Sequence, residues 1–262
     1  MKYKIIILLL ISNLIFSQKG LIKYGYIEAF ANGNAKGPEY VAYMIFNKEV
    51  SYYVTAKDSL EKAEKINAQK TFNNDDDGSA TIHNGLKVSP QGDQVVNNLK
   101  TKTLTSNLLY RNQIYVEENT PIIKWTFSKE SKKIGTFNCK KATANFRGRN
   151  YNAWYTTDIP VSYGPWKLNG LPGLILEAYD SSKNVYWYFE SIDYPTKNKA
   201  NPTSIRKSKT EKTVTFKVYN DFKKIQLDEI IRIKEKNILL KKQMPDIDFM
   251  TPKLDQMFIE CE

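Results

Sequence analysis

Short apolar runs separated by polar turn residues recur along most of the chain. Residues 21–31 (LIKYGYIEAFA), 40–46 and 49–56 combine aliphatic and aromatic side chains, and Asn47-Lys48 separates the last two. Runs of this length between turn residues are typical of strands, and a short polar break between two of them predicts a hairpin. Further short runs occupy residues 80–88, 104–110, 112–118 and 122–127. This spacing predicts an antiparallel sheet or a partial barrel.

The second half of the chain predicts two more hairpins and a helix. The paired runs are 139–146 with 150–157, around the turn-like Arg147–Asn150, and 174–180 with 184–192, around Ser181–Lys183. Residues 212–218 (KTVTFKV) alternate as a strand does. Residues 221–241 place apolar side chains at helical spacing among many charges, which predicts an amphipathic helix capped by Asn220 or Asp221.

Together these runs predict a mainly β fold with minor α content. We expect a strongly curved antiparallel sheet or partial barrel, with the C-terminal amphipathic helix laid against it. Aromatic residues make up 13% of the chain, and broad rings pack well on a pleated sheet. The arrangement resembles that of periplasmic lipoprotein carriers, which is a likeness of fold and shows no function by itself.

Residues 1–17 have the features of a cleavable export signal. Lys2 and Lys4 precede the apolar run Ile5–Ile11, and Ser17 is the small residue before the expected cut. The run is shorter than the roughly 20 apolar residues that span a bilayer, and no later stretch qualifies as a transmembrane segment. We expect an exported protein of the periplasm or cell envelope, with residues 18–262 as a single domain. In that domain, residues 195–210 are expected to form a mobile loop and residues 244–262 a loose tail.

The chain is basic, with a formal net charge of +11. Removing Lys2 and Lys4 with the export signal leaves +9 (11 − 2). A basic protein attracts nucleic acids, acidic glycans and anionic membrane surfaces, and export makes nucleic acid a poor partner. The charges are spread along the chain, which favours a solvated basic surface over a specific polyanion site.

Few residues offer catalytic or metal chemistry. His83 is the single histidine, and its neighbours predict a strand end and turn rather than a catalytic triad. The acidic run at residues 75–77 lacks the closing Glu of a calcium loop, and no metal or cofactor is expected. Cys139 and Cys261 are candidates for a disulfide, which the exported compartment permits. Five acids leave a carboxylate-dependent hydrolase open, namely Asp158, Glu177, Asp180, Glu190 and Asp193.

The most distinctive stretch spells Gly-Leu-Pro-Gly-Leu-Ile at residues 170–175. Ahead of it lie Ile134-Gly135, Cys139-Lys140-Lys141-Ala142, Phe146-Arg147-Gly148-Arg149, Ala153-Trp154-Tyr155-Thr156, Asp158-Ile159-Pro160 and Gly164-Pro165-Trp166-Lys167. The order and spacing from about Ile134 to Asp180 resemble the GLPGLI family, a group of exported Bacteroidetes proteins. The resemblance implies a cell-envelope role, because members of this family stand beside outer-membrane transport and assembly components. It implies no established activity and no catalytic residues.

The same block contains the candidate site residues. Gly170, Pro172 and Gly173 predict a rigid structural corner before a strand, because glycine permits unusual backbone angles and proline fixes its own φ. The alternative is that the loop lines a groove or docks a partner. The candidate ligand or partner surface then comprises Trp154, Trp166, Leu171, Leu174, Arg147 and Arg149. The tryptophans, with Trp187, fit the core better than a ligand platform, and the two arginines could clamp an anion or pair with Asp158 or Glu177.

Three functions remain open from the sequence. The first is a non-catalytic envelope binding or carrier protein for a lipid or other apolar ligand held between sheet and helix. The second is an interaction module that docks on an outer-membrane protein. The third is the carboxylate-dependent hydrolase. A large apolar cavity favours the carrier, a filled core with exposed apolar residues favours docking, and two facing acids in a cleft favour the enzyme.

Overall fold

A computed structural model describes residues 19–30, 33–55, 71–74, 80–83, 92–110, 112–198, 212–247 and 260 of the chain. The predicted export signal, the acidic run at 75–77 and Cys261 therefore lie outside the described residues. The strands are β1 (Gly20–Glu28), β2 (Glu39–Phe46), β3 (Val50–Thr55), β4 (Thr71–Asn74), β5 (Ala80–His83), β6 (Gln94–Asn98), β7 (Thr103–Tyr110), β8 (Asn112–Asn119), β9 (Thr126–Ile134), β10 (Phe137–Phe146), β11 (Arg149–Thr156), β12 (Leu174–Asp180), β13 (Val185–Asp193) and β14 (Thr213–Thr215).

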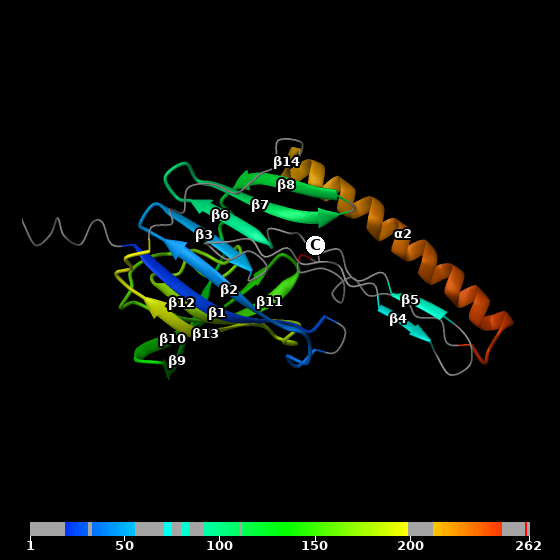
Figure 1. Ribbon diagram of the computed structural model, residues 1–262, viewed down its shortest axis with the longest axis horizontal. Helices are drawn as coiled ribbons and strands as arrows, with labels where there is room; N and C mark the ends of the chain where they lie inside the picture. Colours follow the sequence, from blue (N-terminus) through cyan, green and yellow to red (C-terminus); the bar gives the residue numbers. More distant parts are fainter. Residues whose placement is uncertain are drawn as a thin grey trace, which may run out of the picture.

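Twelve of these strands form one sheet in the order β14-β8-β7-β6-β3-β2-β1-β13-β12-β11-β10-β9. All neighbours are antiparallel except β14 and β8, which run parallel. β1 joins the two halves, because it pairs with β2 on one side and with β13 on the other. Figure 1 shows the two halves folded towards each other around this strand. The predicted mainly β, curved antiparallel sheet is confirmed, and the sheet is open because β14 and β9 form its two ends.

Turn residues fix the predicted hairpins. The side chain of Asn47 accepts hydrogen bonds from the backbone N–H groups of Glu49 and Val50, which closes the turn between β2 and β3. Arg147 and Gly148 have φ of 52° and 77°, so the β10–β11 turn has a positive φ at both central residues. Two-residue hairpin turns of this kind match the right-handed twist of the strands. The turn thus holds Arg147 in a backbone conformation that residues other than Gly, Asn and Asp seldom adopt.

The loop between β11 and β12, residues 157–173, lies inside the bend of the sheet. Its apolar side chains share one core cluster with residues of β1, β2, β3, β6 and β7 as well as β10 to β13. Trp166 stacks on Trp187 with ring centroids 6.2 Å apart, and Trp187 stacks on Tyr26 at 5.1 Å. The hydroxyl of Tyr24 on β1 donates a hydrogen bond to the carbonyl of Ile175, 2.7 Å away. The loop therefore fills the concave side of the sheet with the chain's own side chains.

The two glycines of the loop's corner act by different physical means. Gly170 has a φ of +91°, a backbone conformation that favours glycine. Gly173 has no positive φ, but a methyl group there would overlap the carbonyl oxygen of Thr156 on β11. Pro172 stands between them and is followed by β12. The corner brings the loop's backbone against β11, so that Leu171 and Leu174 turn into the core.

A single long helix, α2 (Phe216–Gln243), follows β14. It begins five residues before the predicted start, and its cap is Thr215 rather than Asn220 or Asp221, because the Thr215 side chain accepts the N–H of Val218. Only Thr213–Thr215 of the predicted strand 212–218 are extended. Figure 1 shows α2 meeting the sheet near β14 and β8 and running beyond it, and described side chains such as Ile225 and Leu239 are 64% and 60% exposed. Within the described residues, no helix combines the length and the apolar character needed to cross a bilayer.

Candidate functional site

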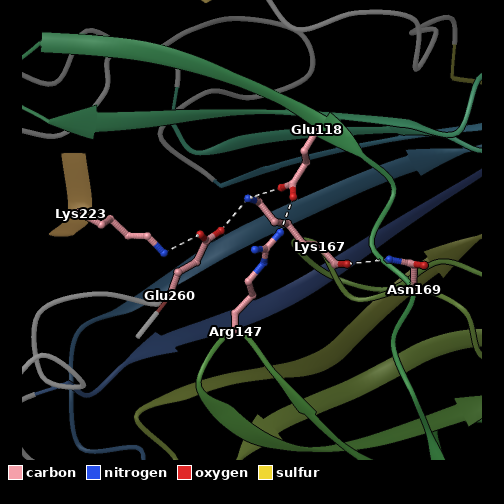
Figure 2. A network of polar contacts seen from close by, with 6 residues as sticks. All are labelled: Glu118, Arg147, Lys167, Asn169, Lys223 and Glu260. Carbon is pink, nitrogen blue, oxygen red and sulfur yellow. Dashed lines mark hydrogen bonds and ion pairs between the residues drawn. The ribbon is translucent and has the colours of Figure 1, made fainter. Parts of the chain in front are cut away.

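A cluster of buried charges joins distant parts of the chain at the side of the filled interior. Lys167, from the interior loop, places its Nζ 2.9 Å from Oε1 of Glu118 at the end of β8 and 2.6 Å from Oε1 of Glu260. Arg147, from the β10–β11 turn, pairs with the other oxygen of Glu118. Lys223 of α2 reaches Oε2 of Glu260 at 3.7 Å. Figure 2 shows the two carboxylates pointing towards each other with Lys167 between them.

This cluster is almost free of solvent. The side chain of Lys167 is 0% exposed, that of Glu118 5% and that of Glu260 1%. Burial alone raises the pKa of the Glu260 carboxyl, but the positive charges of Lys167, Arg147 and Lys223 outweigh it and hold the pKa below its ordinary value. Charges taken out of water persist in folded proteins when they are paired in this way. Glu260 belongs to the predicted loose tail, yet its side chain is among the most buried of the described residues.

Arg147 also ties the helix to the cluster. Its guanidinium lies 3.8 Å from the ring centroid of Phe216, the first residue of α2. A guanidinium held over an aromatic ring gains cation–π attraction in addition to its ion pair. The cluster therefore links β8, the β10–β11 turn, the interior loop, α2 and Glu260. These ion pairs hold the five segments together, so the cluster has a structural role.

The second predicted arginine has a different partner. Arg149 donates to Asp180 at 2.7 Å, and Asp180 also accepts the backbone N–H groups of Asn184 and Val185. Asp180 thereby closes the β12–β13 turn. The two arginines do not converge on one anion, so the predicted clamp is replaced by two separate buried ion pairs. Glu177, one of their predicted partners, binds Lys132 at 2.8 Å instead.

All four apolar candidates for a partner surface lie in the core cluster. Trp166 is 8% exposed, Leu171 1% and Leu174 0%. Trp154 is 7% exposed and is covered by the Nζ atoms of Lys132 and Lys141, which lie 4.4 and 5.8 Å from its ring centroid. Of the two alternatives for this block, the geometry therefore favours the core and the structural corner. A partner would have to bind elsewhere.

Four of the five acids that left a hydrolase open have a partner of their own. Asp180 binds Arg149, Glu177 binds Lys132, and Glu190 binds Lys23 at 2.6 Å. Asp193 accepts a hydrogen bond from the Thr196 hydroxyl. In the described part of the chain, no hydrogen bond joins two of these acids. Cys139 is buried and forms no disulfide in this structure, whereas Cys261 lies outside the described residues.

The described part of the chain has hollows at its surface, and two of them lie near the residues discussed above. One, of about 460 Å³, lies beside the buried charges and is lined by Glu118, Phe216 and Lys217 among others. The other, the aromatic hollow of about 400 Å³, is mainly apolar, and its walls include the rings of Phe137, Phe189 and Tyr194. Asp158 is also among its lining residues. Among the described residues, no group of three His, Cys, Asp or Glu side chains could hold a metal ion.

The most exposed large apolar side chain among the described residues lies just before β9, one of the two end strands of the sheet. Ile122 is 93% exposed and Phe127, at the start of β9, is 61% exposed. Trp125 lies between them in sequence, and its Nε1 donates to the carbonyl of Asn169 at 2.8 Å. The interior loop thus anchors this segment while its neighbours face solvent. The sequence reading placed a strand at 122–127 and missed β9, because TFSKESKKI carries charges where strands usually carry apolar residues.

Residues 147–177 match a family described as a protein of unknown function (Porph_ging). This stretch holds Arg147, Arg149 and Lys167, and therefore much of the buried charge and the interior loop. The predicted GLPGLI block overlaps it.

Among solved structures, PNGF-II in a C2 crystal form has a TM-score of 0.50 at 17% sequence identity, over 78% of this chain and 32% of that one. PNGF-II in a P21 form gives a TM-score of 0.47 at 16% identity, over the same shares. The chain spans about a third of the length of that protein, and the likeness is one of fold. Comparison with curated proteins gives no match.

Proposed function

We propose that this chain is a non-catalytic binding module of the cell envelope that docks on a partner protein through the open end of its sheet. The observation that supports this most is the distribution of apolar side chains. Loop 157–173 fills the concave side of the sheet, whereas Ile122 and Phe127 stay exposed beside β9. A fold whose interior is occupied by its own chain offers its surface for binding.

The exposed apolar residues stand on a fixed support. Trp125 is hydrogen-bonded to the interior loop through Asn169, and Phe127 packs against Tyr155 with ring centroids 6.3 Å apart. Ile123 turns the other way and is 8% exposed. A rigid support lowers the entropy lost when a surface side chain is buried on binding. Ile122 and Phe127 are therefore suited to act as apolar anchors for a partner.

The cell-envelope location rests on the sequence. Residues 1–17 have the pattern of an export signal. The block from Ile134 to Asp180 resembles the GLPGLI family, whose members stand beside outer-membrane transport and assembly components. We therefore propose an exported protein that works with such a component. Cell fractionation with sequencing of the mature N-terminus tests this, and the expected first residue is Gln18.

Position-specific photo-crosslinking in the producing cells tests the docking surface. A photoreactive phenylalanine analogue replaces Phe127 in one strain and Ile238 of α2, which is 50% exposed, in a control strain. The proposal expects one discrete crosslinked protein from position 127 that is absent from position 238, and its loss when Ile122→Ser is added. Equal crosslinking from both positions, or none from position 127, would contradict docking at this end of the sheet.

A second candidate function is binding of an apolar ligand in a hollow at the surface rather than in the interior of the sheet. The aromatic hollow of about 400 Å³ has Phe137 and Phe189 in edge-to-face contact at 6.1 Å, with Tyr194 beside them. A hollow of this size and lining suits a small apolar molecule or a single acyl chain. Asp158, the one acidic residue among those that line it, suits a ligand with a polar or cationic head.

Binding of the fluorescent apolar dye 1-N-phenylnaphthylamine separates this candidate from docking. If the hollow is the binding site, Phe189→Ala should weaken dye binding at least about tenfold, since the side chain forms one wall. Phe127→Ala, outside the hollow, serves as the matched control and should leave dye binding unchanged. Equal dye binding by both variants would remove the hollow as a ligand site.

A further inference from the structure

The two ends of the sheet are unequal. β14 has three residues and continues directly into α2, so this end offers little backbone for a further strand. β9 has nine residues, and in the described part of the chain it pairs with β10 alone. Figure 1 places β9 at the outer margin of the lower half of the molecule. An edge strand of this length carries a row of backbone N–H and C=O groups that can pair with another strand.

The β9–β10 hairpin shows which of these groups face outward. Its turn has two residues, Gly135 with φ of +57° and Thr136, and it is closed by the pair Ile134 and Phe137. In such a turn the closing pair is hydrogen-bonded, and bonded and non-bonded pairs then alternate along the ladder. The N–H groups of Lys133 and Ser131 therefore point away from β10. A register shift between Lys140 and Ala142 limits regular pairing to this end of the hairpin.

The charges at this edge select the kind of strand that can be added. β9 carries Lys129, Lys132 and Lys133 against one acid, Glu130. Lys132 is neutralised by Glu177, and Glu130 by Lys141 from β10. The exposed charged side chains that remain are Lys129 and Lys133 of β9 and Lys140 of the neighbouring β10. Like charges placed opposite one another destabilise a strand pair, and opposite charges stabilise it.

A second copy of this chain is therefore a poor occupant, because pairing β9 with itself would place lysines against lysines. Basic edge strands are a known device against aggregation, and the same charges favour an acidic strand over a neutral one and repel a basic one. Resting on the docking function proposed above, we infer that β9 accepts an extended acidic segment of the partner protein as an added strand. Backbone hydrogen bonds at Ser131 and Lys133 hold the segment, and the three lysines select it.

Two blocked nine-residue peptides test this inference on the mature chain. One alternates Glu and Thr, and the other has Lys in place of every Glu. The acidic peptide should bind and should slow amide hydrogen exchange at Ser131 and Lys133, and the basic peptide should do neither. Ser131→Pro removes an outward N–H donor without removing a ladder bond to β10, and it should weaken the acidic peptide at least about tenfold. Binding of the acidic peptide without protection of these amides would overturn the inference.

Charge reversal provides a test that does not depend on the proline variant folding. Lys129→Glu, Lys133→Glu and Lys140→Glu together should abolish binding of the acidic peptide and create binding of the basic one. The matched control reverses Lys224, Lys234 and Lys236, three exposed lysines of α2, with the same change in net charge. Equal losses in the two triple variants, or no binding of the acidic peptide at millimolar concentration, would overturn the inference. If crosslinking from position 127 survives Ser131→Pro in cells, strand addition fails while docking stands.

Discussion

The buried charge cluster makes the sharpest prediction about stability. Lys167 is fully buried, and its ammonium group is shared by the carboxylates of Glu118 and Glu260. In Lys167→Met the apolar volume is nearly kept, but both carboxylates lose their shortest contact with a lysine. Glu118 keeps Arg147, whereas Glu260 is left with Lys223 at 3.7 Å.

The size of the effect follows from the burial. Removing one partner of a buried ion pair costs about 3–5 kcal/mol, because the other charge stays in a solvent-free site. For a chain of this length, each kcal/mol shifts the midpoint of thermal unfolding by about 2–4 °C. We therefore expect Lys167→Met to lower the free energy of unfolding by about 3–5 kcal/mol and Tm by about 6–20 °C.

Urea titration of the mature protein measures this loss against a matched control. Lys23 lies 2.6 Å from Glu190, the same distance as Lys167 from Glu260, but the side chain of Lys23 is 36% exposed. Lys23→Met should therefore cost at most about 1 kcal/mol. Adding Glu260→Gln to Lys167→Met removes one stranded charge and should recover part of the loss. If Lys167→Met and Lys23→Met cost the same, the cluster does not stabilise the fold as argued.

Three further predictions concern single sites. Glu260→Gln should lower the free energy of unfolding, and the loss should be largest above about pH 5 and shrink as pH falls through the lowered pKa of Glu260. Urea titrations at about pH 7 and about pH 3 measure the loss, and an equal loss at both pH values would refute the prediction. Burial raises the pKa of the Cys139 thiol to about 11. In a Cys261→Ser variant, this thiol should therefore react with a disulfide dye at least about 100-fold more slowly in the folded protein than in the unfolded protein. Thiol counts on unfolded, unreduced wild-type protein separate two free cysteines from the predicted bridge. Gly173→Ala should lower the free energy of unfolding by about 2–3 kcal/mol, because the added methyl group overlaps a β11 carbonyl. Gly170→Ala should lower it by about 1 kcal/mol because of the positive φ there. Thermal unfolding ranks the two variants, and the reverse order would contradict the geometry.

The sequence predicts those parts of the fold that depend on local signals. Alternating apolar residues and turn residues lie close together in sequence, and so the hairpins on either side of Asn47 and Gly148 could be located. Strand β9 escaped because an edge strand needs no continuous apolar face, and its lysines hide the pattern. The start of α2 was misplaced because the alternation of KTVTFKV competes with the cap at Thr215, and the cap prevails from Phe216 onward.

Of the buried charge cluster, the sequence singled out Arg147 as a candidate but not Glu118, Lys167 or Glu260. Arg147 and Arg149 stand two positions apart, yet the turn sends them to different partners, Glu118 and Asp180. Lys167 and Glu260 are 93 residues apart, and no local pattern announces that pair. The inward path of loop 157–173 likewise depends on long-range packing against β1 and β13. Sequence reasoning found the residues of this loop and left open whether they line the core or a surface.

Native mass spectrometry of the protein purified from the envelope of its own cells tests the central claim most directly. The claim is that the chain fills its own interior and binds a partner at the β9 edge. It predicts the mass of the mature polypeptide, alone or with a second polypeptide that dissociates when Lys129, Lys133 and Lys140 are reversed. A lipid-sized adduct that survives this reversal and is lost with Trp166→Ala would place a ligand inside the sheet and contradict the claim.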